Sequence, residues 1–336
     1  MISQNNAISV NKLEKVYSEG LFRRKKFHAL KGIDLTIPQG EIFGLLGPNG
    51  AGKTTFVKIM LGIVEKSSGD AEMMGCRAGS PSARKRVGYL PENLRMRQHH
   101  TANTALEFYG GLNGLSPQQV RAKRKDLLDK VGLSEWANAG IKKFSKGMLQ
   151  RLGLAQALLH DPEMIFLDEP TDGLDPQARA ELRDIMSKLR DDGKTIFINS
   201  HILQEVELVC DSVAILDHGE LKYCGPVRQI GEFIQNKTGV RIGSGITFVV
   251  RCSMEKFHAI AEPGPDDSIN FGTDDCVEFY CTNTDTGFVN STIDRFRASG
   301  VDILEVSKRN VTLEEAFLTI LSSAPSGAQI DKGETE

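Results

Sequence analysis

The sequence lacks the features that would place it inside a membrane, in a secretory pathway or on a nucleic acid. No apolar run approaches the ~18 residues that a membrane-spanning helix needs. The first fifteen residues are polar where a secretory signal would carry its apolar core. Lysine and arginine number 41 against 44 aspartates and glutamates, a net charge of −3, which does not favour a generally basic nucleic-acid binder. We therefore expect a protein that is soluble on its own and not secreted.

Cysteine is scarce and shows no paired spacing. The six cysteines form no CxxC pair, and a chain of 336 residues can bury a core without disulfides. Cys276 and Cys281 are near enough in sequence to meet across a turn, but the set is typical of scattered thiols in a reducing cytosol. An apolar fraction of 40% and a charged fraction of 25% exclude a wholly disordered chain. The length predicts about two domains.

Strand-like and helix-like segments alternate over residues 7–230, which we take as the first domain. Short apolar runs typical of buried strands occupy 42–46, 164–167, 195–199 and 213–216. Helical patterns cover 54–64 and 176–191. This alternation predicts an α/β core with a mainly parallel sheet. Across residues 93–160 the apolar residues recur at helical spacing instead, which predicts a mostly helical subdomain inserted into the core.

The pattern changes after Gly225-Pro226. Strand and helix patterns then follow one another at 246–251, 277–281, 287–298, 301–306 and 312–321. Thr312 followed by Glu315 is typical of a capping box at the start of the last helix. We therefore predict a small α+β accessory domain at 237–322 and a flexible polar tail at 323–336.

The strongest motif is a phosphate-binding loop. It matches G-x-x-x-x-G-K-[ST] between a predicted strand and a predicted helix, and consists of Gly47, Pro48, Asn49, Gly50, Ala51, Gly52, Lys53, Thr54 and Thr55. The glycines let backbone N–H groups approach phosphate oxygens, and the amino terminus of the helix favours negative charge. Lys53 can reach the β- and γ-phosphates of a nucleotide, and the Thr54 hydroxyl can hold Mg²⁺.

A pair of carboxylates forms the second motif. The apolar run at 165–167 delivers Asp168 and Glu169 to the carboxyl end of a predicted strand, where ligands bind in open α/β sheets. Asp168 can hold Mg²⁺ through water, and Glu169 can orient or deprotonate an attacking water. A lone Asp-Glu pair is more often a solvated acidic turn, so this interpretation depends on the phosphate loop beside it.

Between these motifs, residues 144–151 resemble the signature of the ATP-binding subunits of ABC transporters, L-S-G-G-Q ahead of a helix. Ser145 and Gly147 match its serine and second glycine, whereas Phe144, Lys146 and Met148 depart from it. A plain helix cap at Ser145 would explain this segment alone. The order of the motifs along the chain extends the resemblance to about residues 7–230.

The resemblance implies roles for further residues. Tyr17 stands where the family stacks an aromatic ring on adenine, Asp175 lies in the D-loop, and His201 matches the residue that senses the γ-phosphate. Glu92 occupies the Q-loop position in place of glutamine, and its carboxylate can bind Mg²⁺ or water but cannot donate a hydrogen bond.

The family implies an ATPase whose cofactors are ATP and Mg²⁺. Its catalytic residues would be Lys53, Glu169 and His201, and its metal ligands Thr54, Asp168 and Glu92. The nucleotide would be bound by residues 47–55, Tyr17 and Glu92, with Ser145, Gly147 and Asp175 completing the site.

The resemblance also implies partners. In this family two ATPase subunits enclose nucleotide between them, and the signature serine of one closes on the γ-phosphate held by the other. The sequence has one phosphate loop, so a second chain is needed, and we expect a second copy. The stretch 312–318 resembles the carboxyl end of ATPase subunits from bacterial exporters. It suggests a regulatory or dimer-stabilising domain, with a generic accessory domain as the alternative.

We therefore expect a cytoplasmic ATPase subunit, peripheral on the inner face of the membrane, that powers a separate membrane-spanning permease for export. Some ABC-type ATPases act instead on ribosomes or DNA. Those usually carry two cassettes or a long coiled-coil insertion, and this sequence has neither. A binding-only pseudo-ATPase is disfavoured by Lys53, Asp168, Glu169 and His201. The transported substrate is not indicated, because its selection lies mainly in the permease.

Overall fold

The computed structural model describes residues 6–19, 25–238, 245–261, 263–265, 267–272, 276–309 and 312–322. The chain divides into two compact units, residues 1–227 and residues 228–336, called here the first and the second unit. The tail predicted at 323–336 lies outside the described residues. In the described ranges, no helix combines the length and the apolar character needed to cross a bilayer.

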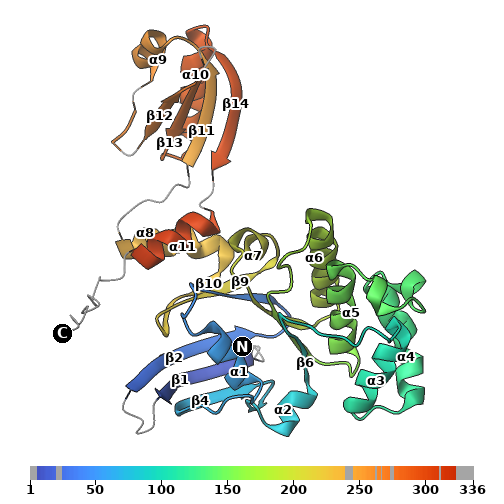
Figure 1. Cartoon of the computed structure of the whole chain (residues 1–336). Helices are drawn as coiled ribbons and strands as arrows, with labels where there is room; N and C mark the ends of the chain where they lie inside the picture. Colours follow the sequence, from blue (N-terminus) through green and yellow to red (C-terminus); the bar gives the residue numbers. More distant parts are fainter. Residues whose placement is uncertain are drawn as a thin grey trace, which may run out of the picture. The chain divides into compact units, whose positions relative to one another are not determined.

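A six-stranded sheet forms the centre of the first unit (Figure 1), in the order β10-β9-β3-β8-β7-β6. Its strands are β3 (Ile42–Leu46), β6 (Val87–Leu90), β7 (Met164–Asp168), β8 (Thr195–Asn199), β9 (Ser212–Asp217) and β10 (Glu220–Pro226). All neighbouring strands pair in parallel except β10, which is antiparallel to β9. Every residue of β3, β7 and β8 is buried, as expected of parallel strands covered on both faces. The predicted α/β core with a mainly parallel sheet is confirmed.

A second, antiparallel sheet adjoins it in the order β2-β1-β4-β5. It consists of β1 (Asn6–Glu19), β2 (Lys25–Pro38), β4 (Ser68–Met73) and β5 (Cys76–Arg77). One hydrophobic core joins its buried side chains to those of β3, β7 and β8. The two sheets therefore form one folding unit, with the phosphate-binding loop emerging from the end of β3.

Helices cover the sheets and form the inserted region. Those of the core are α1 (Lys53–Met60), α2 (Pro81–Lys85), α6 (Pro176–Asp191) and α7 (Leu203–Val209). Between β6 and β7 lie α3 (Ala102–Leu112), α4 (Pro117–Lys130), the short 3-10 turns Ser134–Trp136 and Ile141–Lys143, and α5 (Lys146–Leu158). Helix α5 contacts α3, α4 and α6, so it connects the inserted helical region to the core.

Four phenylalanines fix α1 against the six-stranded sheet. The Phe197 ring of β8 lies 4.7 Å from that of Phe166 and 5.9 Å from those of Phe43 and Phe56, measured between centroids. All four side chains are almost completely buried. Because Phe56 belongs to α1, this cluster sets the position of the helix that follows the phosphate-binding loop.

Helix α1 is shorter than the sequence predicts. The pattern indicated a helix over 54–64, but the helix ends at Met60. Gly62 has a φ of +73°, and its N–H donates to the carbonyl of Ile59 while the N–H of Ile63 donates to that of Lys58. This pair of bonds is a Schellman motif, which ends a helix at a glycine in the left-handed region.

The second unit is a small α+β domain. Its elements are α8 (Ile230–Thr238), β11 (Gly245–Arg251), α9 (Met254–Ile260), β12 (Ser268–Phe271), β13 (Cys276–Cys281), α10 (Thr286–Ala298), β14 (Asp302–Arg309) and α11 (Leu313–Ser322). The antiparallel order β12-β13-β11-β14 with helices after β11 and β13 is a ferredoxin-like β-α-β-β-α-β arrangement. It buries its own hydrophobic cluster around Phe248, Phe257, Phe279 and Phe296.

Two local expectations for this unit can be compared with the structure. The capping box is confirmed, because the N–H of Glu315 donates to Thr312 Oγ1 and the N–H of Thr312 donates to Glu315 Oε2, both at 3.2 Å. Cys276 and Cys281 lie at opposite ends of β13, about 16 Å apart at the usual rise of a strand, so they do not meet across a turn.

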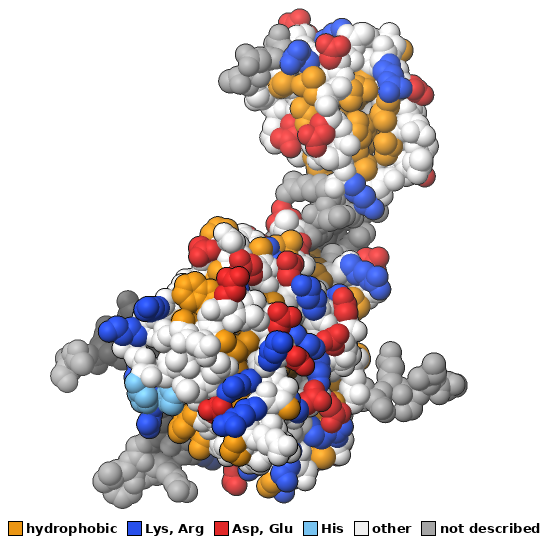
Figure 2. All heavy atoms as spheres, turned by 90° about the vertical axis from the view of Figure 1, so that its right-hand side faces the viewer, with side chains coloured by type: hydrophobic (Ala, Val, Ile, Leu, Met, Phe, Trp, Pro, Cys, Tyr) orange, Lys and Arg blue, Asp and Glu red, His pale blue; other side chains and the backbone are white. Residues whose placement is uncertain are grey.

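Charged side chains of both signs are intermixed on the face of the first unit shown in Figure 2. Ion pairs also join elements of this unit: Arg124 of α4 pairs with Glu107 of α3, and Lys130 of α4 with Asp192 after α6 at 2.9 Å. Exposed pairs of this kind contribute ~0–1 kcal/mol each, so they add little to the stability of the unit.

Candidate active site

The phosphate-binding loop wraps around the ammonium group of Lys53. Its Nζ donates to the carbonyl oxygens of Gly47 at 2.6 Å and Pro48 at 3.2 Å, and the residue is only 8% exposed. Burial lowers the pKa of Lys53, and the carboxylates of Glu169 and Asp168 oppose that shift. The sequence motifs on β3 and β7 are thus brought into electrostatic contact.

Two glycines of the loop are required by space as well as by conformation. A Cβ on Gly47 would lie 2.3 Å from the carbonyl oxygen of Leu216, and one on Gly52 would lie 2.5 Å from that of Ala29. Gly52 also has a φ of +105°. A side chain at either position would force the loop away from the neighbouring backbone.

The surface of the loop suits an anion. Helix α1 begins without a side-chain cap and has no acidic residue in its first turn, so its first N–H groups are available to phosphate. A cavity of about 170 Å³ opens there, lined by Phe27, Ala29 and residues 48–55. The cavity is lined by Asn49, Gly50, Ala51, Thr54 and Thr55, the residues that the sequence motif assigns to phosphate binding.

Asp168 is held by two residues to which the sequence had given no role. Asn199 Nδ2 donates to Asp168 Oδ1 at 2.6 Å, and the Tyr89 hydroxyl donates to Asp168 Oδ2 at 3.4 Å. Burial raises the pKa of Tyr89 to about 12, with further contributions from the charges of Asp168 and Glu92. The charges of Glu92 and Asp168 therefore both act on the Tyr89 hydroxyl. Only the parallel order of β6, β7 and β8 shows that Tyr89 and Asn199 meet Asp168.

Glu169 and His201 are in direct contact. His201 Nδ1 lies 2.9 Å from Glu169 Oε2, and the backbone N–H of His201 donates to the same oxygen at 3.3 Å. Glu169 has a φ of +48°, in the left-handed region, and its N–H donates to the carbonyl of Asn199 at 2.8 Å. A strained backbone of this kind is frequent at functional sites, where the surroundings hold it in place.

Ser145, Gly147 and Asp175 form a second group at the start of α5 and α6. Ser145 Oγ accepts the N–H of Met148 at 3.2 Å, and Asp175 Oδ1 accepts that of Ala178 at 2.8 Å, so each residue caps its helix. A Cβ on Gly147 would lie 2.9 Å from Cβ of Ala178, so the two helix starts are tightly packed. Figure 1 shows α5 among α3, α4 and α6, while α1 lies with the antiparallel sheet.

Two aromatic residues lie opposite each other on β1 and β2, and one of them lines the phosphate-binding cavity. Tyr17 of β1 pairs directly with Phe27 of β2, and directly opposed residues project from the same face of a sheet. The Lys15 ammonium lies 4.9 Å from the centroid of the Tyr17 ring. Phe27 is 55% exposed and lines the cavity, a position that sequence reasoning missed. No local pattern in the sequence marks Phe27, because β2 reaches the loop only in the folded chain.

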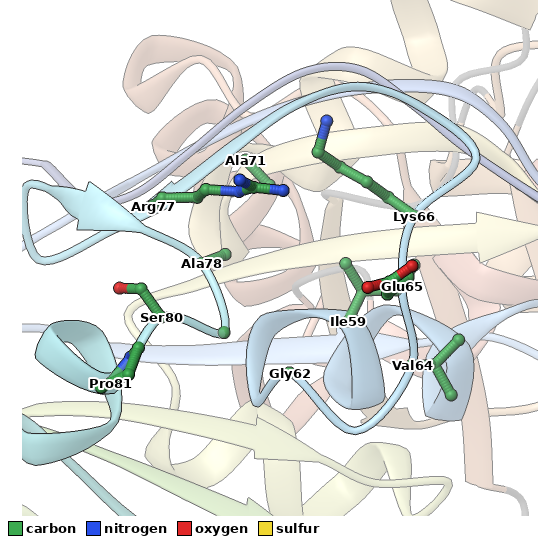
Figure 3. Close-up of a pocket in the computed structure, with 11 residues that line it drawn as sticks. Ile59, Gly62, Val64, Glu65, Lys66, Ala71, Arg77, Ala78, Ser80 and Pro81 are labelled. Carbon is green, nitrogen blue, oxygen red and sulfur yellow. The ribbon is translucent and has the colours of Figure 1, made fainter.

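A larger cavity, about 440 Å³, lies elsewhere in the first unit (Figure 3), between the end of α1, β4, β5 and the start of α2. Lys66 and Arg77 line it, together with apolar side chains such as Ile59 and Val64. Lys66 already bonds the carbonyl of Gly69 and pairs with Asp70. None of the predicted site residues lines this cavity.

Comparison with known proteins defines the class of protein. Residues 30–172 match the family model described as ABC transporter. An uncharacterized ABC transporter ATP-binding protein of Nostoc sp. is 47% identical over 227 residues, 67% of this chain and 68% of its own. The daunorubicin resistance ATP-binding protein DrrA3 of Streptomyces coeruleorubidus is 30% identical over 316 residues, 94% of this chain and 95% of its own. A solved ATP-binding subunit of an ABC transporter superposes with a TM-score of 0.59 at 29% identity, covering 70% of this chain and 95% of its own.

The chain belongs to the ATP-binding proteins of ABC transporters, which confirms the resemblance based on its motifs. It has the ABC-type ATPase fold and binds ATP as a member of a family whose cassettes hydrolyse it. Subunits of this family dimerise and work with membrane permeases.

Proposed function

We propose that this chain is the ATP-hydrolysing subunit of an exporter, in which ATP-driven closure of a dimer powers a separate membrane permease. The observation that carries the hydrolytic part is the contact between Glu169 and His201, next to the strand that places Lys53. Export is supported by the relative named for daunorubicin resistance, because its match covers both units of this chain.

ATP is the substrate of the first step. The N–H groups of residues 49–55 would bind its phosphates, and Lys53 would exchange its bonds to Gly47 and Pro48 for phosphate oxygens. Tyr17 and Phe27 offer ring faces for adenine on the same face of the sheet. Because the Lys53 ammonium is already buried, little further desolvation is needed for it to act on the phosphates.

The oxygen-rich residues of the site fit Mg²⁺. Thr54, Asp168 and Glu92 would hold it, since hydroxyl and carboxylate oxygens are its preferred ligands. The buried Oδ1 of Asn199 accepts no hydrogen bond from the described residues, so it can accept one from a metal-bound water. When bound, Mg²⁺ would neutralise charge on the β- and γ-phosphates.

Glu169 would orient and deprotonate the attacking water. His201 holds the Glu169 carboxylate through Nδ1 and the backbone N–H, and its ring would also sense the γ-phosphate. A second copy would supply its own Ser145 and Gly147 to that phosphate, with Asp175 at the same interface. Each site would therefore be composite, and a single subunit would hydrolyse ATP poorly.

The permease would be contacted near Glu92, where the core meets the inserted helical region. The subunit would lie on the cytoplasmic face of the membrane through this contact, bind no nucleic acid, and pair as a homodimer. Residues 237–322 would regulate or stabilise that dimer.

The test uses Glu169→Gln, which keeps the shape of the side chain but removes the base. We expect ATP and Mg²⁺ to convert this variant from monomer to dimer in size-exclusion chromatography with light scattering, while hydrolysis falls by ~100-fold or more. Glu135→Gln on an exposed turn is the matched control and should hydrolyse ATP like the unmodified protein. Hydrolysis by Glu169→Gln at the unmodified rate would contradict the assignment.

A further inference from the structure

Lys146 replaces a glycine of the family signature with a cation, and the structure gives this cation a partner. Its Nζ lies 3.2 Å from Oδ2 of Asp172, in the loop after the carboxylate pair. The side chain crosses Gly173, where a Cβ would lie 2.4 Å from Lys146 Nζ and 3.4 Å from Cε. The start of α5 and the loop at 170–174 are therefore joined by an extended lysine lying on a glycine.

The same loop leads back to the carboxylate that we assign as the base. The N–H of Asp172 donates to the carbonyl of Glu169 at 3.2 Å, and that of Leu174 to the carbonyl of Thr171 at 3.3 Å. Glu169 itself has a φ of +48°, a conformation that persists only where the surroundings hold it. On one side, the N–H of Glu169 donates to the carbonyl of Asn199 in the sheet. On the other side, the carbonyl of Glu169 accepts the N–H of Asp172 in the loop.

We propose that Lys146 and Asp172 are a positioning pair, which ties the signature helix to the loop after Glu169 and so keeps that carboxylate in its hydrolytic position. This inference rests on the proposed role of Glu169 as base. The pair would make hydrolysis sensitive to whatever moves the start of α5, such as closure of a second copy on it. The hydrogen bonds of Lys53 to Gly47 and Pro48 do not involve Lys146 or Asp172. Removing the pair should therefore leave ATP binding unchanged.

Three variants of the full chain test the pair: Lys146→Met, Asp172→Asn and the charge swap Lys146→Asp with Asp172→Lys. We expect each single change to speed amide hydrogen exchange across residues 169–175 and to lower kcat by about tenfold, with KM for ATP within about twofold. The charge swap should restore both quantities to within about threefold of the unmodified protein. Melting curves check that the variants fold.

A matched control exists in the same unit. Lys130 and Asp192 also join the inserted helical region to the core, at 2.9 Å, with exposures of 52% and 54% against 52% and 48% for Lys146 and Asp172. Lys130→Met and Asp192→Asn remove an ion pair of equal exposure away from Glu169. We expect neither to change the exchange of residues 169–175 or kcat.

Several outcomes would overturn the proposal. One is unchanged exchange of residues 169–175 in both single variants, and another is a charge swap that stays as slow as the singles. A third is normal kcat in Asp172→Asn beside an impaired Lys146→Met, which would mean that the lysine acts alone on a bound phosphate. If Glu169→Gln hydrolysed ATP normally, the proposed function would fail, yet the exchange measurement would still decide whether the pair holds the loop.

Discussion

At the residue scale, the positions predicted from the sequence are those that a local motif defines. Lys53, Asp168 and Glu169 follow from short patterns next to strands, and the structure brings them together. No short pattern marks Tyr89, Asn199 and Phe27, because their partners are distant in sequence. Tyr89 meets Asp168 only because β6 pairs with β7, and Phe27 meets the loop only because β2 passes beside it.

Glu41, just before β3, is a further residue that no motif marks. Its Oε2 accepts a hydrogen bond from Ser212 Oγ at 3.3 Å, while its buried Oε1 accepts none from the described residues. Burial raises the pKa of Glu41 to about 7, the bond from Ser212 opposes this, and the nearby charge of Asp211 adds to it. The folded protein therefore retains a proton on Glu41 at a pH where the unfolded chain has released it.

This difference in the pKa of Glu41 between the folded and unfolded chain predicts that the free energy of unfolding falls as pH rises. The contribution of Glu41 is fully present below its unfolded pKa of 4.5 and is lost as pH passes through about 7. Glu41→Gln should remove this dependence and raise the free energy of unfolding at pH 8 by ~1 kcal/mol, allowing for solvent screening. Urea unfolding at pH 5.5 and pH 8 measures both effects. An unchanged difference between the two pH values in Glu41→Gln would refute the assignment.

At the scale of elements, apolar patterns located most of the buried strands of the six-stranded sheet but missed β6 and the long pair β1 and β2. β3 and β8 coincide with their predicted ranges, because each is a continuous apolar run bounded by turns. β1 and β2 carry many polar residues, and their pairing shifts register at four places, which breaks the alternation expected of a strand. α9 and β12 are too short for periodicity to reveal them.

The Phe197 cluster gives a prediction for β8. Phe197→Ala should lower the free energy of unfolding by ~3–5 kcal/mol, because its ring contacts three buried aromatics on α1, β3 and β7. Phe108→Ala is the control, because this residue of α3 is 39% exposed. It should lower the free energy of unfolding by less than ~1 kcal/mol. Denaturant unfolding followed by circular dichroism compares them. Equal losses would mean that the cluster does not hold α1 on the sheet.

At the scale of the whole molecule, the chain has two units, each with a hydrophobic cluster of its own. The sequence predicted an α/β domain at 7–230 and a small α+β domain at 237–322, because the pattern of strand-like and helix-like segments changes after Gly225-Pro226. It could not predict the ferredoxin-like order of strands, since strand pairing depends on contacts between residues far apart in the chain.

Two separate clusters predict two unfolding transitions in calorimetry. ATP with Mg²⁺ at about 100 times Kd should stabilise the first unit by ~2.7 kcal/mol and leave the second unchanged, because the ligand binds only the first. Phe248→Ala should lower only the transition of the second unit, since this side chain lies in its cluster. A single transition that ATP and Phe248→Ala both shift would show that the units unfold together.

The hydrogen bonds from Lys53 to Gly47 and Pro48 have a consequence for how the loop receives phosphate. Two carbonyl groups of the loop and the ammonium group at its centre hold one another, so the curvature of the loop is supported by the protein's own atoms. The next nucleotide then meets a surface that is already built, and its capture is an exchange of partners around one ammonium group. Phosphate capture would accordingly require the Lys53 ammonium group to change partners, without rebuilding of the phosphate-binding loop.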